Sequence, residues 1–89
     1  MYLHLGQDFI LHTRDIIGIF DMETATLSRH TRDFLRRAET EGAVVSLSND
    51  LPKSFVLADW PDEAVFISPI SSATLKKRCG VLPSGDGDE

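Results

Sequence analysis

The sequence predicts an α+β fold: an antiparallel, β-rich single domain with one long helix at about 26–41 and a short C-terminal helix at about 71–78. Short apolar and β-branched runs, separated by turn-forming residues, predict the strands. One stretch has an extended helical periodicity. Only the connection through this stretch is long enough for a parallel crossover, so we expect antiparallel strand pairs to dominate. The length of 89 residues allows one domain.

The first three strands are predicted around Gly6 and Gly18. Residues 2–5 and 9–11 carry apolar residues on either side of Gly6, which allows the positive φ that a tight hairpin turn needs. Residues 16–20 are β-branched and bounded by charged residues, which indicates a third strand. A glycine inside such a strand, here Gly18, indicates a bulge or a close approach of the backbone.

The long helix at 26–41 is predicted from apolar residues that recur at helical spacing. They are Leu27, Thr31, Phe34, Leu35 and Ala38. Thr24 or Thr26 is expected to cap the start of this helix, because a threonine hydroxyl accepts a hydrogen bond from a free backbone N–H group. Gly42 stands where a C-terminal cap is expected.

Three further strands and the short helix follow, separated by segments rich in turn-forming residues. The strands are expected at 44–47, 54–58 and 64–68, with a loop at 48–53 and a hairpin turn at 59–63. Ser71 or Ser72 is expected to cap the helix that ends at Arg78.

Residues 1–79 are expected to form the folded domain, and residues 80–89 a flexible acidic tail. The single cysteine excludes an internal disulfide and is typical of a cytosolic protein. No apolar run approaches the roughly 20 residues that span a bilayer. We therefore expect a cytoplasmic protein without a membrane partner.

The predicted sheet has more apolar surface than one helix can cover. Tyr2, Phe9 and Leu11 are candidates for the second face, and no predicted element remains to cover all of it. Exposed apolar surface of this kind usually marks an interface. We therefore expect the chain to assemble with copies of itself.

Seven basic residues are candidates for nucleic-acid binding: Lys53, Lys76, Lys77, Arg78, Arg29, Arg32 and Arg36. The three helix arginines fall on one stripe opposite the apolar face, where guanidinium groups can bind phosphates. Three of the other cations close the short helix. A local positive surface is compatible with the net charge of −5, because salt screens charges that are more than about 10 Å apart.

Each of these groups also has a purely structural interpretation. Asp33 and Glu39 can neutralise the helix arginines on an ordinary solvated face. The helix dipole favours cations at a C-terminus, which accounts for residues 76–78 without any partner. Lys53 is a single lysine beside a proline in a turn-rich loop. From the sequence, the structural interpretation is favoured for Lys53, and both interpretations stay open for the cations of the two helices.

The sequence contains no pattern from which we can assemble a catalytic, metal or cofactor site. His4, His12 and His30 lack metal-ligand spacing, and His30 flanks the apolar face of the helix, where a partly buried structural histidine is expected. Cys79 follows three basic residues, which would favour its thiolate, but no histidine base is in register with it. We expect neither an enzyme nor a bound metal, cofactor or small-molecule substrate.

Five segments together resemble the RemA/RemB family of extracellular matrix regulators, long catalogued as a domain of unknown function. They are Tyr2–Gly6, Asp15–Asp21, Phe34-Leu35, Pro52–Ser54 and Ser71–Arg78. The similarity extends from residue 1 to about residue 78. It implies a cytoplasmic bacterial regulator, because RemA-like relatives bind DNA upstream of biofilm-matrix operons, activate transcription and assemble as rings of identical subunits.

One departure from the family pattern concerns the loop before Ser54. RemA-like proteins carry adjacent arginines there that are implicated in DNA contact, whereas this chain has Leu51 and Pro52, followed by Lys53. The resemblance implies a DNA-associated transcriptional regulator of matrix genes that acts as a homo-oligomer, with DNA contact resting on the remaining cations. The alternative is an oligomeric scaffold or co-regulator that binds protein and not DNA, which the acidic net charge favours.

Overall fold

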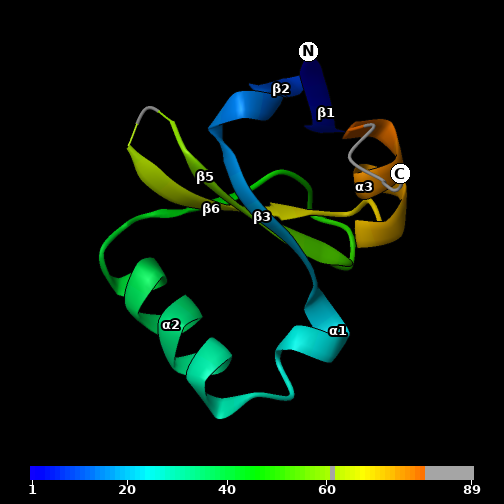
Figure 1. The fold of residues 1–89 in the computed structure, drawn as a ribbon. Helices are drawn as coiled ribbons and strands as arrows, with labels where there is room; N and C mark the ends of the chain where they lie inside the picture. Colours follow the sequence, from blue (N-terminus) through cyan, green and yellow to red (C-terminus); the bar gives the residue numbers. More distant parts are fainter. Residues whose placement is uncertain (61, 80–89) are drawn as a thin grey trace.

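Short strands and helices follow one another along the chain. In residues 1–60 and 62–79, which the computed structural model describes, the elements are β1 (Tyr2–Gly6), β2 (Phe9–His12), the 3-10 helix η1 (Thr13–Asp15), β3 (Ile16–Asp21), α1 (Met22–Ala25), α2 (Arg29–Thr40), β4 (Val44–Ser46), β5 (Ser54–Asp59), β6 (Glu63–Ser68) and α3 (Ser72–Cys79). The α+β class predicted from the sequence is confirmed (Figure 1).

Strands β3, β5, β6 and β4 form one sheet in this order, and β1 and β2 form a separate hairpin. The β3–β5 and β5–β6 pairs are antiparallel, and the β6–β4 pair is parallel. The two edge strands, β3 and β4, therefore run in the same direction. The chain joins them through α1 and α2, which is the crossover that the sequence predicted.

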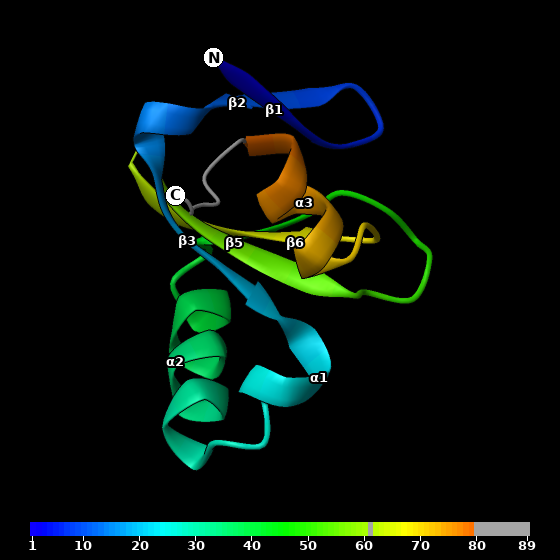
Figure 2. The ribbon, with the colours of Figure 1, turned by 45° about the vertical axis from the view of Figure 1, so that its right-hand side comes forward.

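The sheet lies between two layers, with α1 and α2 on one face and the hairpin and α3 on the other (Figures 1 and 2). Strand β5 contributes side chains to the cores on both sides of the sheet, because successive side chains of a strand point to opposite faces. Val56 and Ala58 belong to the core under the hairpin, together with Leu3, Leu5, Leu11, Leu47, Phe66, Leu75 and Cys79. Phe55 belongs to the core under α2, with Val65 and Ala38.

The expectation of an uncovered second sheet face is wrong. The hairpin folds back over that face, so that Leu11 is buried and Phe9 is half-buried in the core. Tyr2 instead points outward and is 68% exposed. A hydrogen bond from the Ser68 hydroxyl to the Leu5 carbonyl oxygen holds the hairpin in place. The sequence pattern did not reveal this contact, because it joins residues 63 positions apart.

Both glycines of the early strands have the predicted roles. Gly6 has a φ of 139° and Gln7 a φ of 50° at the turn between β1 and β2. The register of β3 and β5 shifts between Ile16 and Gly18, which confirms the bulge. The ring of Phe20 also lies over Gly18, so a Cβ atom at this position would be 2.7 Å from two ring carbons.

The long helix begins later than predicted, and Leu27 does not belong to its apolar face. Asp21 caps a separate short helix, α1, by accepting a hydrogen bond from the Thr24 N–H group at 2.8 Å, and Ser28 caps α2. Neither Thr24 nor Thr26 is therefore the cap of the long helix. Leu27 lies in the turn between the two helices and is 79% exposed. Periodicity missed this break because Leu27 happens to fit the helical spacing.

The end of α2 and the hairpin of β5 and β6 agree with the predictions. Gly42 has a φ of 74°, and the Ala43 N–H group donates to the Ala38 carbonyl oxygen at 2.8 Å. Strands β5 and β6 pair from residue 54 to residue 68 around the predicted turn. None of the helices in the described residues is long and apolar enough to cross a membrane. The predicted tail, residues 80–89, lies outside the described residues.

Candidate nucleic-acid interface

Helix α3 carries three exposed cations, and buried residues on its other side hold it against the core. Ser71 caps the helix, and its hydroxyl accepts a hydrogen bond from the Thr74 N–H group at 3.2 Å. Leu75 and Cys79 are buried and hold the helix against β1 and β3. The exposed side carries Lys76, Lys77 and Arg78. Within the described part of the chain, none of these three cations forms an ion pair.

Lys53 lies at the end of the sheet from which α3 starts. Its N–H group donates to the Ser68 carbonyl oxygen at 2.9 Å, and its carbonyl oxygen accepts a hydrogen bond from the Met22 N–H group at 3.0 Å. The hydroxyl of the next residue, Ser54, donates to the Ile70 carbonyl oxygen at 2.7 Å, in the segment that leads to α3. The side chain of Lys53 is exposed. The structure therefore brings Lys53 towards the start of α3.

Among the residues that the structure describes, the carboxylate of Asp21 lies near this cationic region. Asp21, at the end of β3, is in register with Ser54 of β5. Hydrogen bonds from Thr24 lower the pKa of Asp21 most, and the Lys76 ammonium group adds a smaller lowering. Asp21 is therefore ionised near neutral pH and reduces the positive charge of its surroundings.

The arginines on the exposed stripe of α2 form ion pairs and hydrogen bonds within the chain. Asp33 pairs with Arg36 at 3.2 Å and with Arg29 at 3.8 Å. Arg32 donates through Nη1 to two carbonyl oxygens of the turn between α1 and α2, at 2.7 and 3.1 Å. Neutralisation by Asp33, one of the two interpretations of the sequence, is thus confirmed. Glu39, which was considered with it, forms no ion pair among the residues that the structure describes.

The two cationic groups lie in opposite layers of the fold. Helix α2 lies on one face of the sheet and α3 on the other (Figure 2). The seven candidate residues therefore do not form one surface. The structure places Lys53 at the end of the sheet from which α3 starts, and it separates α3 from the arginines of α2. Within the described chain, none of the three cations of α3 forms an ion pair, whereas Arg29 and Arg36 of α2 both pair with Asp33.

The histidines and the cysteine do not form a metal site in residues 1–60 and 62–79, where no three potential ligands gather. His30 is exposed and not partly buried as expected. Burial raises the pKa of the Cys79 thiol, which is the opposite of the expected effect of the neighbouring cations. His12 Nδ1 accepts a hydrogen bond from the Arg14 N–H group at 3.2 Å. Desolvation, the N-terminal charge and Arg14 lower the pKa of His12.

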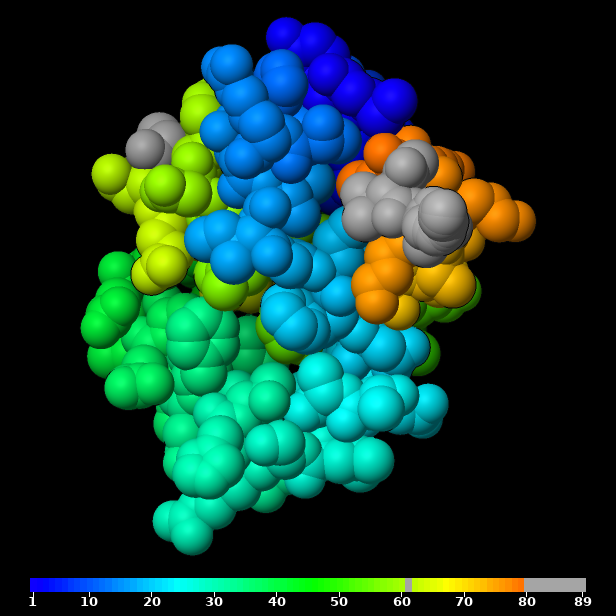
Figure 3. Space-filling model, viewed as in Figure 1, coloured from blue at the N-terminus to red at the C-terminus, as the bar shows by residue number. Residues whose placement is uncertain are grey.

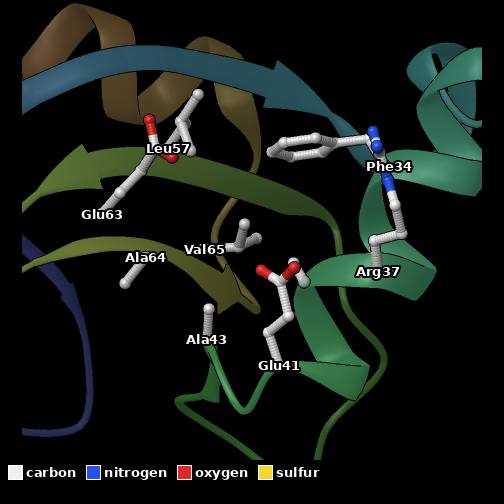
Figure 4. A pocket seen from close by; sticks show the side chains of 9 residues that line it. Phe34, Arg37, Glu41, Ala43, Leu57, Glu63, Ala64 and Val65 are labelled. Carbon is white, nitrogen blue, oxygen red and sulfur yellow. The ribbon is translucent and has the colours of Figure 1, made fainter.

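A groove beside α2 was not predicted from the sequence. Figure 4 shows part of its lining, which combines apolar side chains such as Phe34, Leu57 and Val65 with the charged side chains of Arg37 and Glu41. Which part of the sheet face α2 leaves open depends on the position of the helix, and the sequence pattern does not contain this information.

Comparison with known proteins identifies the family. A family model described as RemA-like, extracellular matrix regulatory protein A-like, matches residues 2–79, and thus every element from β1 to α3. The chain belongs to this family. Extracellular matrix regulatory protein B of Bacillus subtilis (strain 168) is 45% identical to it over 78 residues, which cover 88% of this chain and 89% of that protein. The resemblance that we inferred from five short segments is therefore confirmed.

Proposed function

We propose that this protein is a cytoplasmic bacterial regulator of extracellular matrix genes that associates with DNA and works as a homo-oligomer. Family membership supports the regulatory role, since the Bacillus subtilis relative is named an extracellular matrix regulatory protein. One observation carries the assignment of the DNA contact. Lys76, Lys77 and Arg78 are exposed and unpaired within the described residues, whereas two arginines of α2 share Asp33.

The cations of α3 suit a phosphate backbone because no carboxylate of residues 1–60 or 62–79 forms an ion pair with them. Each phosphate that they neutralise would release condensed counterions, which favours binding at low salt. Arg78 can offer paired N–H donors to phosphate oxygens, whereas Lys76 and Lys77 act as point charges. Lys53 extends this surface along the end of the sheet. Contacts of this kind position a protein on DNA without reading the base sequence.

Assembly is supported by the two open edges of the sheet. Strands β3 and β4 are the edges, and each carries an exposed apolar side chain, Ile17 at 57% and Val45 at 39%. Strand β3, blue in Figure 3, lies at the surface of the molecule. Because β3 and β4 run in the same direction, β4 of one copy can pair in parallel with β3 of the next, in a head-to-tail contact. Repetition of the α3 cations would then raise the avidity for DNA.

Light scattering at micromolar concentration tests the assembly. We expect a species larger than a dimer, and a monomer of 9.9 kDa would contradict the proposal. Val45→Lys, on the edge strand β4, should reduce the mass of the assembly because it places a charge at the paired edge. The matched control is Leu27→Lys, which changes another exposed apolar residue but lies in the turn between α1 and α2.

Fluorescence anisotropy with double-stranded DNA at two salt concentrations tests the DNA contact. We expect wild type to bind at low salt. Lys76→Ala/Lys77→Ala/Arg78→Ala should bind much more weakly, with a salt slope that is flatter by about one unit for each phosphate that the variant no longer neutralises. The control variant Arg29→Ala/Arg36→Ala removes cations that are already paired, so its affinity should change far less. A larger effect in the control would contradict the assignment to α3.

A second candidate function is an oligomeric scaffold or co-regulator that binds protein and not DNA. It is favoured by the net charge of −5 and by Leu51, which is 80% exposed where the resemblance led us to expect arginine. Assembly of the wild type without DNA binding at low salt would favour this function. Leu51→Arg/Pro52→Arg should strengthen DNA binding if the loop faces the duplex, and should have no effect on DNA binding if the loop does not.

A further inference from the structure

One face of the central sheet is wider than the helical layer that covers it. Strands lie about 4.8 Å apart, whereas an α-helix with its side chains is about 10 Å wide, so one helix covers roughly two strands of four. Helix α2 packs chiefly on β4 and β6, and the short α1 packs at the end of β3 and β5. On this face Phe55 of β5 is buried, whereas Leu57 of β5 and Phe20 of β3 stay partly exposed in the described chain.

The open strip is an apolar groove that runs beside α2. Its first part lies between Phe20 of β3 and Phe34 of α2, with His30 at its end. The adjoining part, shown in Figure 4, extends from Phe34 to Glu41. Because Phe34 and Leu57 line both parts, the two parts adjoin each other. The ring of Phe20 remains 40% exposed at its edge.

We propose that this groove binds an amphipathic α-helix of a protein partner. The groove follows α2 from His30 to Glu41, a length of about 16 Å at 1.5 Å per residue, which accommodates about three helical turns. Its apolar floor suits a helix with apolar residues at positions i, i+3 or i+4, and i+7. Docking would cover Phe20 and complete the helical layer on this face. The proposal goes beyond DNA binding and does not depend on it, because α3 lies in the other layer.

The charges at the two ends of the groove determine the direction of the bound helix. Glu41 and Glu63 lie at one end, next to Arg37, and none of the three forms an ion pair in the part of the chain that the structure describes. His30 lies at the other end. The positive end of a helix dipole is its N-terminus, and two carboxylates stabilise it together with lysines in the first turn. The bound helix therefore runs antiparallel to α2.

The described residues of a second copy do not offer a suitable helix. The apolar face of α2, which includes Phe34 and Ala38, already packs on its own sheet. Leu75 and Cys79 of α3 are buried in their own core. Leu27 is exposed, but it is a single side chain in a turn and not a helical stripe. The chemistry of the groove therefore points to a different protein.

A synthetic peptide tests the proposal. The probe is a labelled helical peptide of about four turns, with leucines at i, i+3, i+4 and i+7, lysines in the first turn and glutamates in the last. One control peptide has the same composition with scrambled leucine positions, and a second has the charges of its two ends exchanged. We expect saturable binding of the probe in anisotropy titrations, no saturable binding of the scrambled peptide, and weaker binding of the charge-exchanged peptide.

Protein variants locate the binding site. Phe20→Asp should weaken probe binding by about tenfold or more, as expected for an interface anchor. Ile10→Asp is the matched control, since Ile10 is 54% exposed but belongs to the hairpin in the other layer. Glu63→Lys changes only the rim and should reverse the preference between the two charge arrangements. This variant keeps the test decisive if Phe20→Asp does not fold.

Three results of the binding titrations would overturn the proposal. They are equal binding of the scrambled peptide, unchanged probe affinity in Phe20→Asp, and no binding of the probe to wild type. Loss of self-association in Phe20→Asp but not in Ile10→Asp would assign the groove to a second copy and would also overturn it. DNA titrations with the same variants separate these results from a failure of the DNA proposal, because neither residue lies on α3.

Discussion

Replacement of Gly18 by alanine tests how the ring of Phe20 is held at the edge of the groove. Gly18 does not have a positive φ, so the backbone can accept alanine. The added Cβ atom, however, would lie 2.7 Å from the Cε2 and Cζ atoms of Phe20. Carbon atoms in contact lie about 3.5–4.0 Å apart, so the phenyl ring must move by about 1 Å. This movement shifts it from Phe55, on which it stacks with centroids 5.0 Å apart.

We expect Gly18→Ala to reduce the free energy of unfolding by about 1 kcal/mol. Loss of the aromatic pair costs about 0.5–1.5 kcal/mol, and the strain of overpacking adds about 1 kcal/mol. The lower backbone entropy of the unfolded chain offsets about 0.4–1 kcal/mol of this cost. The strain stays at the low end of its usual range because the Phe20 ring is 40% exposed and can turn towards solvent.

Urea unfolding of wild type, Gly18→Ala, Phe20→Ala and the double variant measures this coupling. In the Phe20→Ala background, Gly18→Ala should stabilise the protein by about 0.4–1 kcal/mol, because the ring atoms that the Cβ atom would meet are gone. All four proteins are compared at one subunit concentration, since assembly adds to apparent stability. An equal destabilisation in both backgrounds would refute the role assigned to the ring.

Leu75→Ala should lower the free energy of unfolding by about 2–5 kcal/mol because it empties a fully buried site under α3, whereas Lys77→Ala should change it by less than about 0.5 kcal/mol. Equal effects would contradict the packing of α3. Because the folded state lowers the pKa of His12, the unfolded chain binds the proton more readily, and stability should fall as the pH drops below the ordinary value of 6.5. His12→Asn should flatten this part of a melting-temperature profile, and an unchanged profile would show that His12 is not responsible. Cys79 should react with a thiol reagent far more slowly in the folded protein than in urea, because burial raises the pKa of its thiol, and equal rates would contradict that burial.

Local elements could be predicted from the sequence because neighbouring residues determine them. Gly6 and Gly42 stand where the backbone adopts a positive φ, and Ser71 accepts the hydrogen bond that starts α3. The bulge at Gly18 could also be predicted, since a glycine inside a strand indicates such a site. The turn at Gly6, the helix end at Gly42 and the cap at Ser71 depend on contacts within a few positions of the chain.

The sequence identified the candidate cations, but it did not show which of them are paired within the chain or which lie close together. The pairing of Asp33 with Arg36 follows from their helical spacing, so the neutralisation of this arginine could be predicted from the sequence. The grouping of Lys53 with the start of α3 could not, because it depends on the hydrogen bond between Ser54 and Ile70, 16 positions apart.

The sequence by itself determined the strands, the C-terminal end of the long helix and the family, whereas only the tertiary structure decided which surfaces are covered. The hairpin covers one sheet face and is held there by a hydrogen bond between residues 63 positions apart, and α2 leaves a groove on the other face because it packs chiefly on β4 and β6. Local hydrogen bonds and φ preferences are encoded within a few residues. The burial of a face depends instead on how elements distant in sequence pack, and a linear pattern of apolar residues does not specify this packing.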